Sequence, residues 1–223
     1  MSVKNQFSKY AKEYKNHNII QQIVAKSLVR ELKFQPKRVL ELGCGSGQVF
    51  NHITWDIEFY KAIDFSSSMC ELHPKGENIE VKCFDFDTQE FLDEIKNNSY
   101  DIVLSSSALQ WSKDLSKIIK QLSLITNEIN AVLFTSNTFK TIQEITNTKS
   151  PILDENSIKE AFSKYFTCEF ETILYKLEFD NKKDLFDYIK KSGVSGGNAS
   201  LNFADAKKLY KEYNLNYLEF EVI

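Results

Sequence analysis

The residues with the clearest potential for chemistry form a cluster of alternating glycines, Glu41-Leu42-Gly43-Cys44-Gly45-Ser46-Gly47, between a predicted strand and a predicted helix. Glycines at such a junction permit a tight turn and let a ligand approach the backbone. The spacing is G-x-G-x-G, and Gln48 stands where the fingerprint of NAD- and FAD-binding proteins has its last glycine. No Gly-Lys-Ser/Thr follows, which excludes a phosphate-binding P-loop. A simple turn is the alternative, but three of only seven glycines in the chain lie here.

Two acids stand at the ends of later predicted strands. Asp64 ends the second strand, where an ionised carboxylate can accept both hydroxyls of a ribose. The alternative for Asp64 is a helix N-cap, because three serines follow at 66–68. Asp85 and Phe86 end the third strand, where an acid can accept from an adenine amino group while an aromatic ring covers the base. The alternative for Asp85 is a solvated loop acid.

Metal and disulfide chemistry have no support in the spacing of cysteines and histidines. The four cysteines, at 44, 70, 83 and 168, form no C-x-x-C pair. The three histidines, at 17, 52 and 73, show no ligand spacing to them. We therefore expect ordinary reduced thiols and no structural zinc.

Alternating strands and helices must position these residues. Apolar runs predict strands at 38–42, 58–63, 79–83, 100–105 and 130–135. A helix over 17–32 precedes them, after a shorter polar helix at about 6–14. Another helix is expected directly after the glycines, with its inward face formed by Val49, Phe50 and Ile53. Asp114 is expected to cap the helix before the fifth strand. This order is typical of βαβ units and a parallel sheet.

The end of the chain has a different pattern. The apolar phase of 166–179 slips between Phe170 and Ile173, which indicates a bulge or break in one long strand. Helices are predicted at 182–191 and 203–213, with a glycine-rich loop at 192–198 between them. The last residues, 215–223, alternate as a strand. The two late strands could therefore form an antiparallel pair.

Composition excludes several classes of protein. The chain has 223 residues, of which 42% are hydrophobic and 26% charged, so it can bury a sizeable core and is not disordered. No apolar run is long enough to span a membrane, and residues 1–10 lack the apolar core of a secretory signal, so a cytoplasmic location is expected. The net charge of −3 argues against a general nucleic-acid binder. Basic residues nevertheless gather in 1–30, with six against one acid, and in 181–213, with seven against four.

The glycine motif and the two acids, in this order, resemble the class I S-adenosylmethionine-dependent methyltransferases. The resemblance implies an α/β, Rossmann-like fold, with a seven-stranded, mostly parallel sheet, an antiparallel last strand and helices on both faces. It also implies one domain over 1–223, made of a helical arm (1–34), a cofactor-binding core (36–180), a helical lid (181–213) and a final strand (214–223). The implied cofactor-binding residues are Gln21, Glu41, Gly43, Cys44, Gly45, Gly47, Asp64, Phe65, Met69, Asp85, Phe86 and Ser105.

The flanking segments are similar to a narrower group, the malonyl-acyl-carrier-protein O-methyltransferases of biotin synthesis. The similar stretches are 7–14 with Gln21, 107–111 followed by Asp114-Leu115, and 185–194. An Ala-Leu-Gln-Trp run at 108–111 also occurs in trans-aconitate methyltransferases. The resemblance suggests Tyr10, Tyr14, Gln110 and Trp111 as substrate-binding residues. Core packing is the alternative for the tyrosines.

The implied reaction is methyl esterification of the free carboxylate of malonyl-acyl carrier protein. That carboxylate is already ionised at pH 7, so no catalytic residue is required and orientation dominates. The two basic segments are then a docking surface for the acidic carrier protein, although solvated helix faces would have the same composition. The alternatives are a methyltransferase of a free small acid such as aconitate, and a cofactor-binding protein without catalysis.

Overall fold

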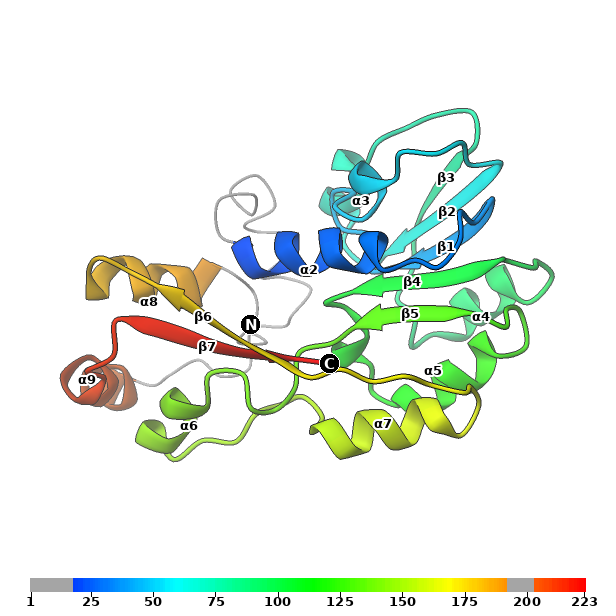
Figure 1. Cartoon of the computed structure of the whole chain (residues 1–223). Helices are drawn as coiled ribbons and strands as arrows, with labels where there is room; N and C mark the ends of the chain where they lie inside the picture. The colour runs from blue at the N-terminus through cyan, green and yellow to red at the C-terminus, as the bar shows by residue number, and fades with distance from the viewer. Residues whose placement is uncertain (1–17, 192–202) are drawn as a thin grey trace. The chain divides into compact units, whose positions relative to one another are not determined.

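A computed structural model describes residues 18–191 and 203–223 (Figure 1). These residues fall into two compact units. One comprises 21–133 and 156–170. The other comprises 18–20, 134–155, 171–191 and 203–223. The organisation as one domain with an arm and a lid stays a prediction.

The first unit contains a parallel sheet whose strand order is β3-β2-β1-β4-β5. Its strands are β1 (Arg38–Leu42), β2 (Phe59–Asp64), β3 (Ile79–Cys83), β4 (Ile102–Ser106) and β5 (Ile129–Val132). The chain winds outward from β1 to β3 and then crosses back to β4 on the other side of β1. Loops that leave β1 and β4 therefore separate at the carboxyl edge, which is where open α/β sheets bind their ligands.

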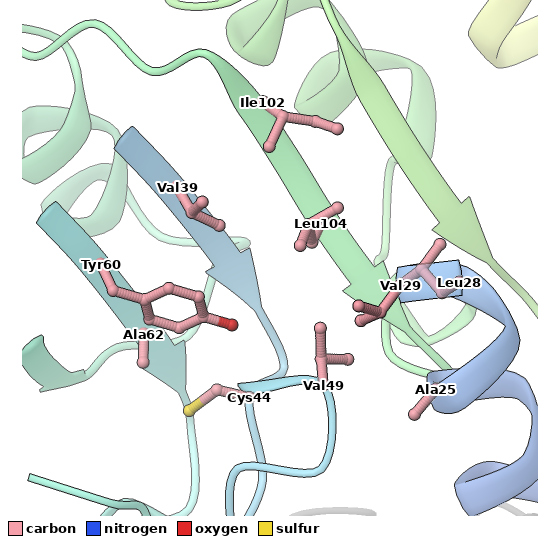
Figure 2. Packing of buried hydrophobic residues seen from close by; sticks show 10 residues of the cluster. All are labelled: Ala25, Leu28, Val29, Val39, Cys44, Val49, Tyr60, Ala62, Ile102 and Leu104. Atoms are coloured by element: carbon pink, nitrogen blue, oxygen red, sulfur yellow. The ribbon is translucent and has the colours of Figure 1, made fainter. Parts of the chain in front are cut away.

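Helix α2 (Ile19–Arg30) covers one face of this sheet through a continuous apolar cluster (Figure 2). Ala25, Leu28 and Val29 of the helix pack with buried side chains of the three central strands. On the strands the cluster comprises Val39, Tyr60, Ala62, Ile102 and Leu104, joined by Cys44 and Val49 from the loop after β1. The alternate residues Leu40 and Val103 are also fully buried, so both faces of the sheet are covered.

The remaining elements of the first unit connect the strands. The helices are α3 (Ser67–Leu72), α4 (Gln89–Ile95), α5 (Leu115–Leu122) and α7 (Glu155–Ser163). The first residue of α7, Glu155, belongs to the other unit. Two 3₁₀ turns, η2 (Phe50–His52) and η3 (Leu109–Trp111), complete the connections. The predicted cap of α5 is confirmed, because the Asp114 carboxylate accepts from the backbone N–H of Lys117 at 2.9 Å. The predicted bounds of β1 and β3 are confirmed as well.

The second unit is built around an antiparallel ribbon of β6 (Ile173–Glu178) and β7 (Tyr217–Val222), which confirms the expected late pair. Its helices are α6 (Lys140–Thr146), α8 (Lys182–Lys191) and α9 (Phe203–Glu212). Phe220 of β7 lies 5.0 Å from Phe139 and 5.9 Å from Tyr188, measured between ring centroids. The predicted break before Ile173 is also confirmed, since residues 167–172 are not in a strand.

The prediction of one seven-stranded sheet is wrong. In the described ranges, five parallel strands form one sheet, and β6 and β7 form a second sheet of their own. The edge of β7 that does not pair with β6 bonds instead to the segment after β5: Thr135 N–H donates to Glu221 O at 2.9 Å and Phe139 N–H to Glu219 O at 2.9 Å. That segment cannot continue as a strand, because Phe139 adopts a left-handed φ of 60°.

A second correction concerns the helix expected directly after the glycines. Gly47 has a φ of +88°, which no right-handed helix can contain, and only the 3₁₀ turn η2 follows before Ile53 returns to extended backbone. Val49 is buried as expected, whereas Phe50 and Ile53 are only half-buried. The polar helix predicted at 6–14 and the loop at 192–198 lie outside the described residues.

Candidate functional site

The loop after β1 is held against the end of β2. The backbone N–H groups of Gly43 and Cys44 both donate to Ile63 O, at 2.7 and 3.0 Å. Gly43, Gly45 and Gly47 all adopt positive φ, at 74°, 51° and 88°. An L-residue pays about 1–2 kcal/mol for such a conformation, so the alternation of glycines is a backbone requirement of this turn.

The three glycines differ in what surrounds them. A β-carbon on Gly43 would lie 2.0 Å from Ala108 Cβ, and one on Gly47 would lie 2.5 Å from Pro74 Cδ. A β-carbon on Gly45 would meet nothing within 4 Å. Gly43 and Gly47 therefore allow close packing inside the protein, whereas Gly45 presents bare backbone to open space where a ligand can approach.

Asp64, the last residue of β2, is buried and faces this loop. Its carboxylate accepts from Gly45 N–H at 3.0 Å and from Ser66 N–H at 2.8 Å. Burial raises the pKa of Asp64 to about 6, and these two hydrogen bonds oppose the shift. The N-cap alternative for Asp64 is wrong, because Ser66 is the N-cap of α3 and the Asp64 carboxylate bonds to the backbone N–H of Ser66 itself. An ionised carboxylate has further lone pairs, so it can still accept from a ligand hydroxyl.

Glu41 is buried on β1 and belongs to a small polar group beneath the glycine loop. The Tyr60 hydroxyl donates to Glu41 Oε2 at 2.5 Å, and His73 Nε2 lies 3.9 Å from the same oxygen. Burial, followed by the charge of Glu41, raises the pKa of Tyr60 well above its usual value. The other ring nitrogen of His73 lies 2.9 Å from Pro74 O and must carry a hydrogen to bond there. Glu41 is thus fixed by a neighbour from β2.

The end of β4 and the segment after it lie beside the glycine loop. Ser105 is buried and its hydroxyl donates to Leu42 O at 3.0 Å, which ties β4 to the start of the glycine loop. Ser107 adopts a φ of 59°, and its carbonyl accepts from Gln110 Nε2 at 2.8 Å. Three buried oxygens of this segment have no hydrogen-bond partner among the described residues: Ser106 Oγ, Ser107 Oγ and Gln110 Oε1. Buried polar atoms are nearly always paired, so these oxygens point to a polar ligand or water.

The other predicted site residues take varied positions. Phe65 and Trp111 are half-buried, and Met69, Phe86 and Gln21 are buried. Asp85 is exposed, and its carboxylate accepts from the backbone N–H of Asp87 at 3.0 Å, as in the loop-acid alternative. Tyr10 and Tyr14 lie outside the described residues.

The sequence interpretation missed Tyr60 and His73. Tyr60 reads as an ordinary apolar strand residue, and its contact with Glu41 follows from the parallel register that pairs Val39 with Tyr60 and Glu41 with Ala62. The spacing of residues along the chain does not predict this strand register. His73 lies in a short turn after α3, and only the fold brings it beneath Glu41.

The described residues were also compared with the requirements of a metal site and of a membrane-spanning helix. Over the described ranges, no group of three or more His, Cys, Asp or Glu side chains could hold a metal ion. In the same part of the chain, every helix is too short or too polar to cross a membrane.

Comparison with known proteins agrees with this geometry. Residues 40–127 match the family described as "Methyltransferase domain". The malonyl-[acyl-carrier protein] O-methyltransferase of Bacillus cereus is 24% identical over 88% of this chain and 81% of its own length. The enzyme of the same name from Buchnera aphidicola is 28% identical over 82% of this chain and 70% of its own length.

Solved structures share the fold. The YcgJ protein of Bacillus subtilis superposes with a TM-score of 0.65 at 12% identity, over 90% of this chain and 96% of its own. The plantazolicin methyltransferase BpumL, solved in complex with SAH, superposes with a TM-score of 0.53 at 14% identity, over 99% of this chain and 93% of its own. The chain is therefore an S-adenosylmethionine-dependent methyltransferase with the class I fold.

Proposed function

We propose that this chain transfers a methyl group to the free carboxylate of malonyl-acyl carrier protein, an early step of the pimeloyl branch of biotin synthesis. The observation that carries the proposal is the similarity to enzymes of that name, which covers 88% of the chain and so extends beyond the methyltransferase domain at 40–127. At 24% identity, this similarity supports the acceptor only in combination with the chemistry of the site.

The glycine loop and Asp64 fit the cofactor. S-adenosylmethionine, when bound, supplies an electrophilic methyl group on a sulfonium. Gly45 would let the cofactor lie against its backbone, because nothing occupies the space where a β-carbon would stand. Asp64 would accept from the ribose hydroxyls, and Glu41 would face the positively charged methionine end. Asp85 and Phe86 would contact the adenine.

The acceptor carboxylate needs no deprotonation by the enzyme. A malonyl carboxyl group titrates near or below about pH 4.3, so at neutral pH its oxygen is already a nucleophile. The chain's contribution is to hold that oxygen in line with the methyl group and to exclude water, and orientation alone can supply roughly 7–11 kcal/mol of the barrier. In and after β4, the side chains of Ser105 and Gln110 donate to backbone carbonyl oxygens and not to a general base.

The carboxylate would be held by hydroxyl groups rather than by arginine. Of the chain's two arginines, Arg38 begins β1 at the opposite edge of the sheet, where its Nε donates to Ser99 O. Arg30 ends α2 with an exposed side chain. Ser106 and Ser107, whose hydroxyls have no partner among the described residues, supply donors at the carboxyl end of β4. Two hydroxyl donors there suit one carboxylate.

The carrier protein would dock through lysines. Lys183, Lys207 and Lys208 are exposed on α8 and α9, and they belong to the basic 181–213 segment. The basic residues of 1–17 lie outside the described residues. Each exposed ion pair contributes less than about 1 kcal/mol, so we expect the main effect on association rate and salt dependence.

The test offers labelled S-adenosylmethionine with three acceptors: malonyl-acyl carrier protein, malonyl-coenzyme A and trans-aconitate. The proposal predicts label on the carrier protein, released by mild base as expected for a methyl ester, and a kcat/KM that falls as salt rises. Label on the free acids alone would assign a small-acid methyltransferase. Binding of the cofactor without label on any acceptor would indicate a non-catalytic protein. A kcat/KM insensitive to salt would remove the docking surface from the proposal.

A further inference from the structure

Three cysteines far apart in the sequence meet beside the glycine loop. The Cys70 thiol donates to Asp64 O at 3.5 Å and lies 3.7 Å from Lys82 O, so it bridges the ends of β2 and β3. The Cys83 thiol lies 3.6 Å from Phe65 O, and Cys83 pairs with Asp64 in the strand register. The side chains of Cys44 and Cys83 are both near enough to Cys70 to shift the pKa of its thiol. Cys70 is therefore the central member of the thiol cluster Cys44–Cys70–Cys83.

The three thiols differ in access and in acidity. Cys83 is exposed, whereas Cys70 and Cys44 are buried. The hydrogen bond from Cys44 lowers the pKa of the Cys70 thiol, although burial opposes this shift. The pKa of the Cys44 thiol is raised well above its usual value, first by the same hydrogen bond and then by burial. Oxidants thus reach Cys83 first, Cys70 is the neighbour best able to react with it, and Cys44 is the least reactive.

We propose that Cys83 and Cys70 form an oxidation-sensitive thiol pair that controls access to the adenosine end of the cofactor site. The oxidant is hydrogen peroxide. The Cys83 thiolate attacks one peroxide oxygen, the O–O bond breaks, and a sulfenic acid forms while hydroxide leaves and takes up a proton to become water. The Cys70 thiolate then attacks the sulfenic sulfur and expels hydroxide, which takes up a proton to leave as water. The two sulfurs each lose one electron, the peroxide gains two, and a Cys70–Cys83 disulfide and two waters are formed.

This linkage would act where the proposed cofactor contacts lie, and the inference to that extent rests on the proposed function. Cys70 bonds to the backbone carbonyl of Asp64, and Cys83 bonds to that of Phe65. The sulfurs of a disulfide carry no hydrogen, so both of these hydrogen bonds are lost. The Asp64 carboxylate then loses its position beside Gly45, so we expect the affinity for S-adenosylmethionine to fall at least tenfold and to recover on reduction.

The experiment treats the full-length enzyme with hydrogen peroxide, with and without a later thiol reductant. Peptide mapping under non-reducing conditions locates any disulfide, and calorimetry measures the dissociation constant for S-adenosylmethionine. We expect a Cys70–Cys83 linkage and a reversible loss of affinity. The Cys83→Ser variant should bind the cofactor normally when reduced and keep its affinity after peroxide. Cys168→Ser, which changes a thiol of the second half of the chain, should remain as sensitive as the wild type.

Several results would overturn the inference: no Cys70–Cys83 linkage, a linkage through Cys44 instead, or an equal loss of affinity in Cys83→Ser. Failure of the proposed function has a different signature, because the reduced wild type would then bind S-adenosylmethionine without transferring its methyl group to malonyl-acyl carrier protein. The mapped disulfide reports on the thiol pair in either case.

Discussion

Replacing two neighbouring glycines by alanine should separate folding from binding. At Gly45 the only folding cost is the left-handed backbone, about 1–2 kcal/mol for an L-residue, because nothing lies within 4 Å of the new β-carbon. At Gly43 the same backbone cost applies, and the new β-carbon lies 2.0 Å from Ala108 Cβ, where about 3.5–4.0 Å is normal. Overpacking adds about 1–3 kcal/mol, for a total of about 2–5 kcal/mol.

Urea unfolding and calorimetry with S-adenosylmethionine measure the two effects. We expect Gly45→Ala to lose at least tenfold in affinity with little loss of stability, and Gly43→Ala to lose stability first. Adding Ala108→Gly to Gly43→Ala removes the clashing carbon and should restore part of that stability. Gly76→Ala serves as a control, because its nearest neighbours would be side-chain atoms and not backbone: Ile79 Cδ1 at 3.1 Å, with Asn78 Oδ1 and Ile79 Cγ1 at 3.4 Å. Wild-type affinity in Gly45→Ala, or equal stability of the two variants, would refute this account of the loop.

Three further predictions concern buried groups. The pKa of Asp64 is raised to about 6, so protonation of its carboxyl group stabilises the folded state. This contribution to the free energy of unfolding, up to about 3 kcal/mol, is fully present below about pH 4 and is lost as the pH rises through 6. Unfolding free energies at pH 4 and 8 should show this difference in the wild type relative to Asp64→Asn, and parallel profiles would contradict it. Lys61 is buried and pairs with the carboxylates of Glu80 and Glu94. Lys61→Met should therefore lower the free energy of unfolding in urea by about 1–3 kcal/mol. An unchanged urea midpoint would mean that these ion pairs do not stabilise the fold. Tyr60→Phe removes the donor to the buried Glu41 carboxylate and should cost a similar amount, whereas a neutral effect in thermal unfolding would mean that water replaces the hydroxyl.

Local patterns in the sequence predicted most of the first unit. The β1 and β3 bounds and the Asp114 cap follow from apolar runs and capping chemistry that act within a few residues. The alternating glycines also predicted the turn itself. All three glycines adopt positive φ, but only Gly45 of the three has open space where a ligand can approach. The sequence pattern does not distinguish Gly45 from the other two.

Features that depend on distant neighbours could not be predicted in the same way. The helix expected after the loop fails because Gly47 needs a φ of +88° to pack against Pro74. The single seven-stranded sheet fails because β7 bonds on its second edge to the turn around Phe139. The contact between Tyr60 and Glu41 and the meeting of the thiols likewise arise only when the strands are in register.

Intact-protein mass spectrometry of malonyl-acyl carrier protein, after incubation with this chain and S-adenosylmethionine, shows whether the carrier protein is the methyl acceptor. We expect a carrier protein heavier by one methyl group in place of one hydrogen, with the change reversed by mild base and slower to form when Gly45→Ala replaces the wild type. A carrier protein of unchanged mass, from an enzyme that binds S-adenosylmethionine, would contradict the proposed acceptor.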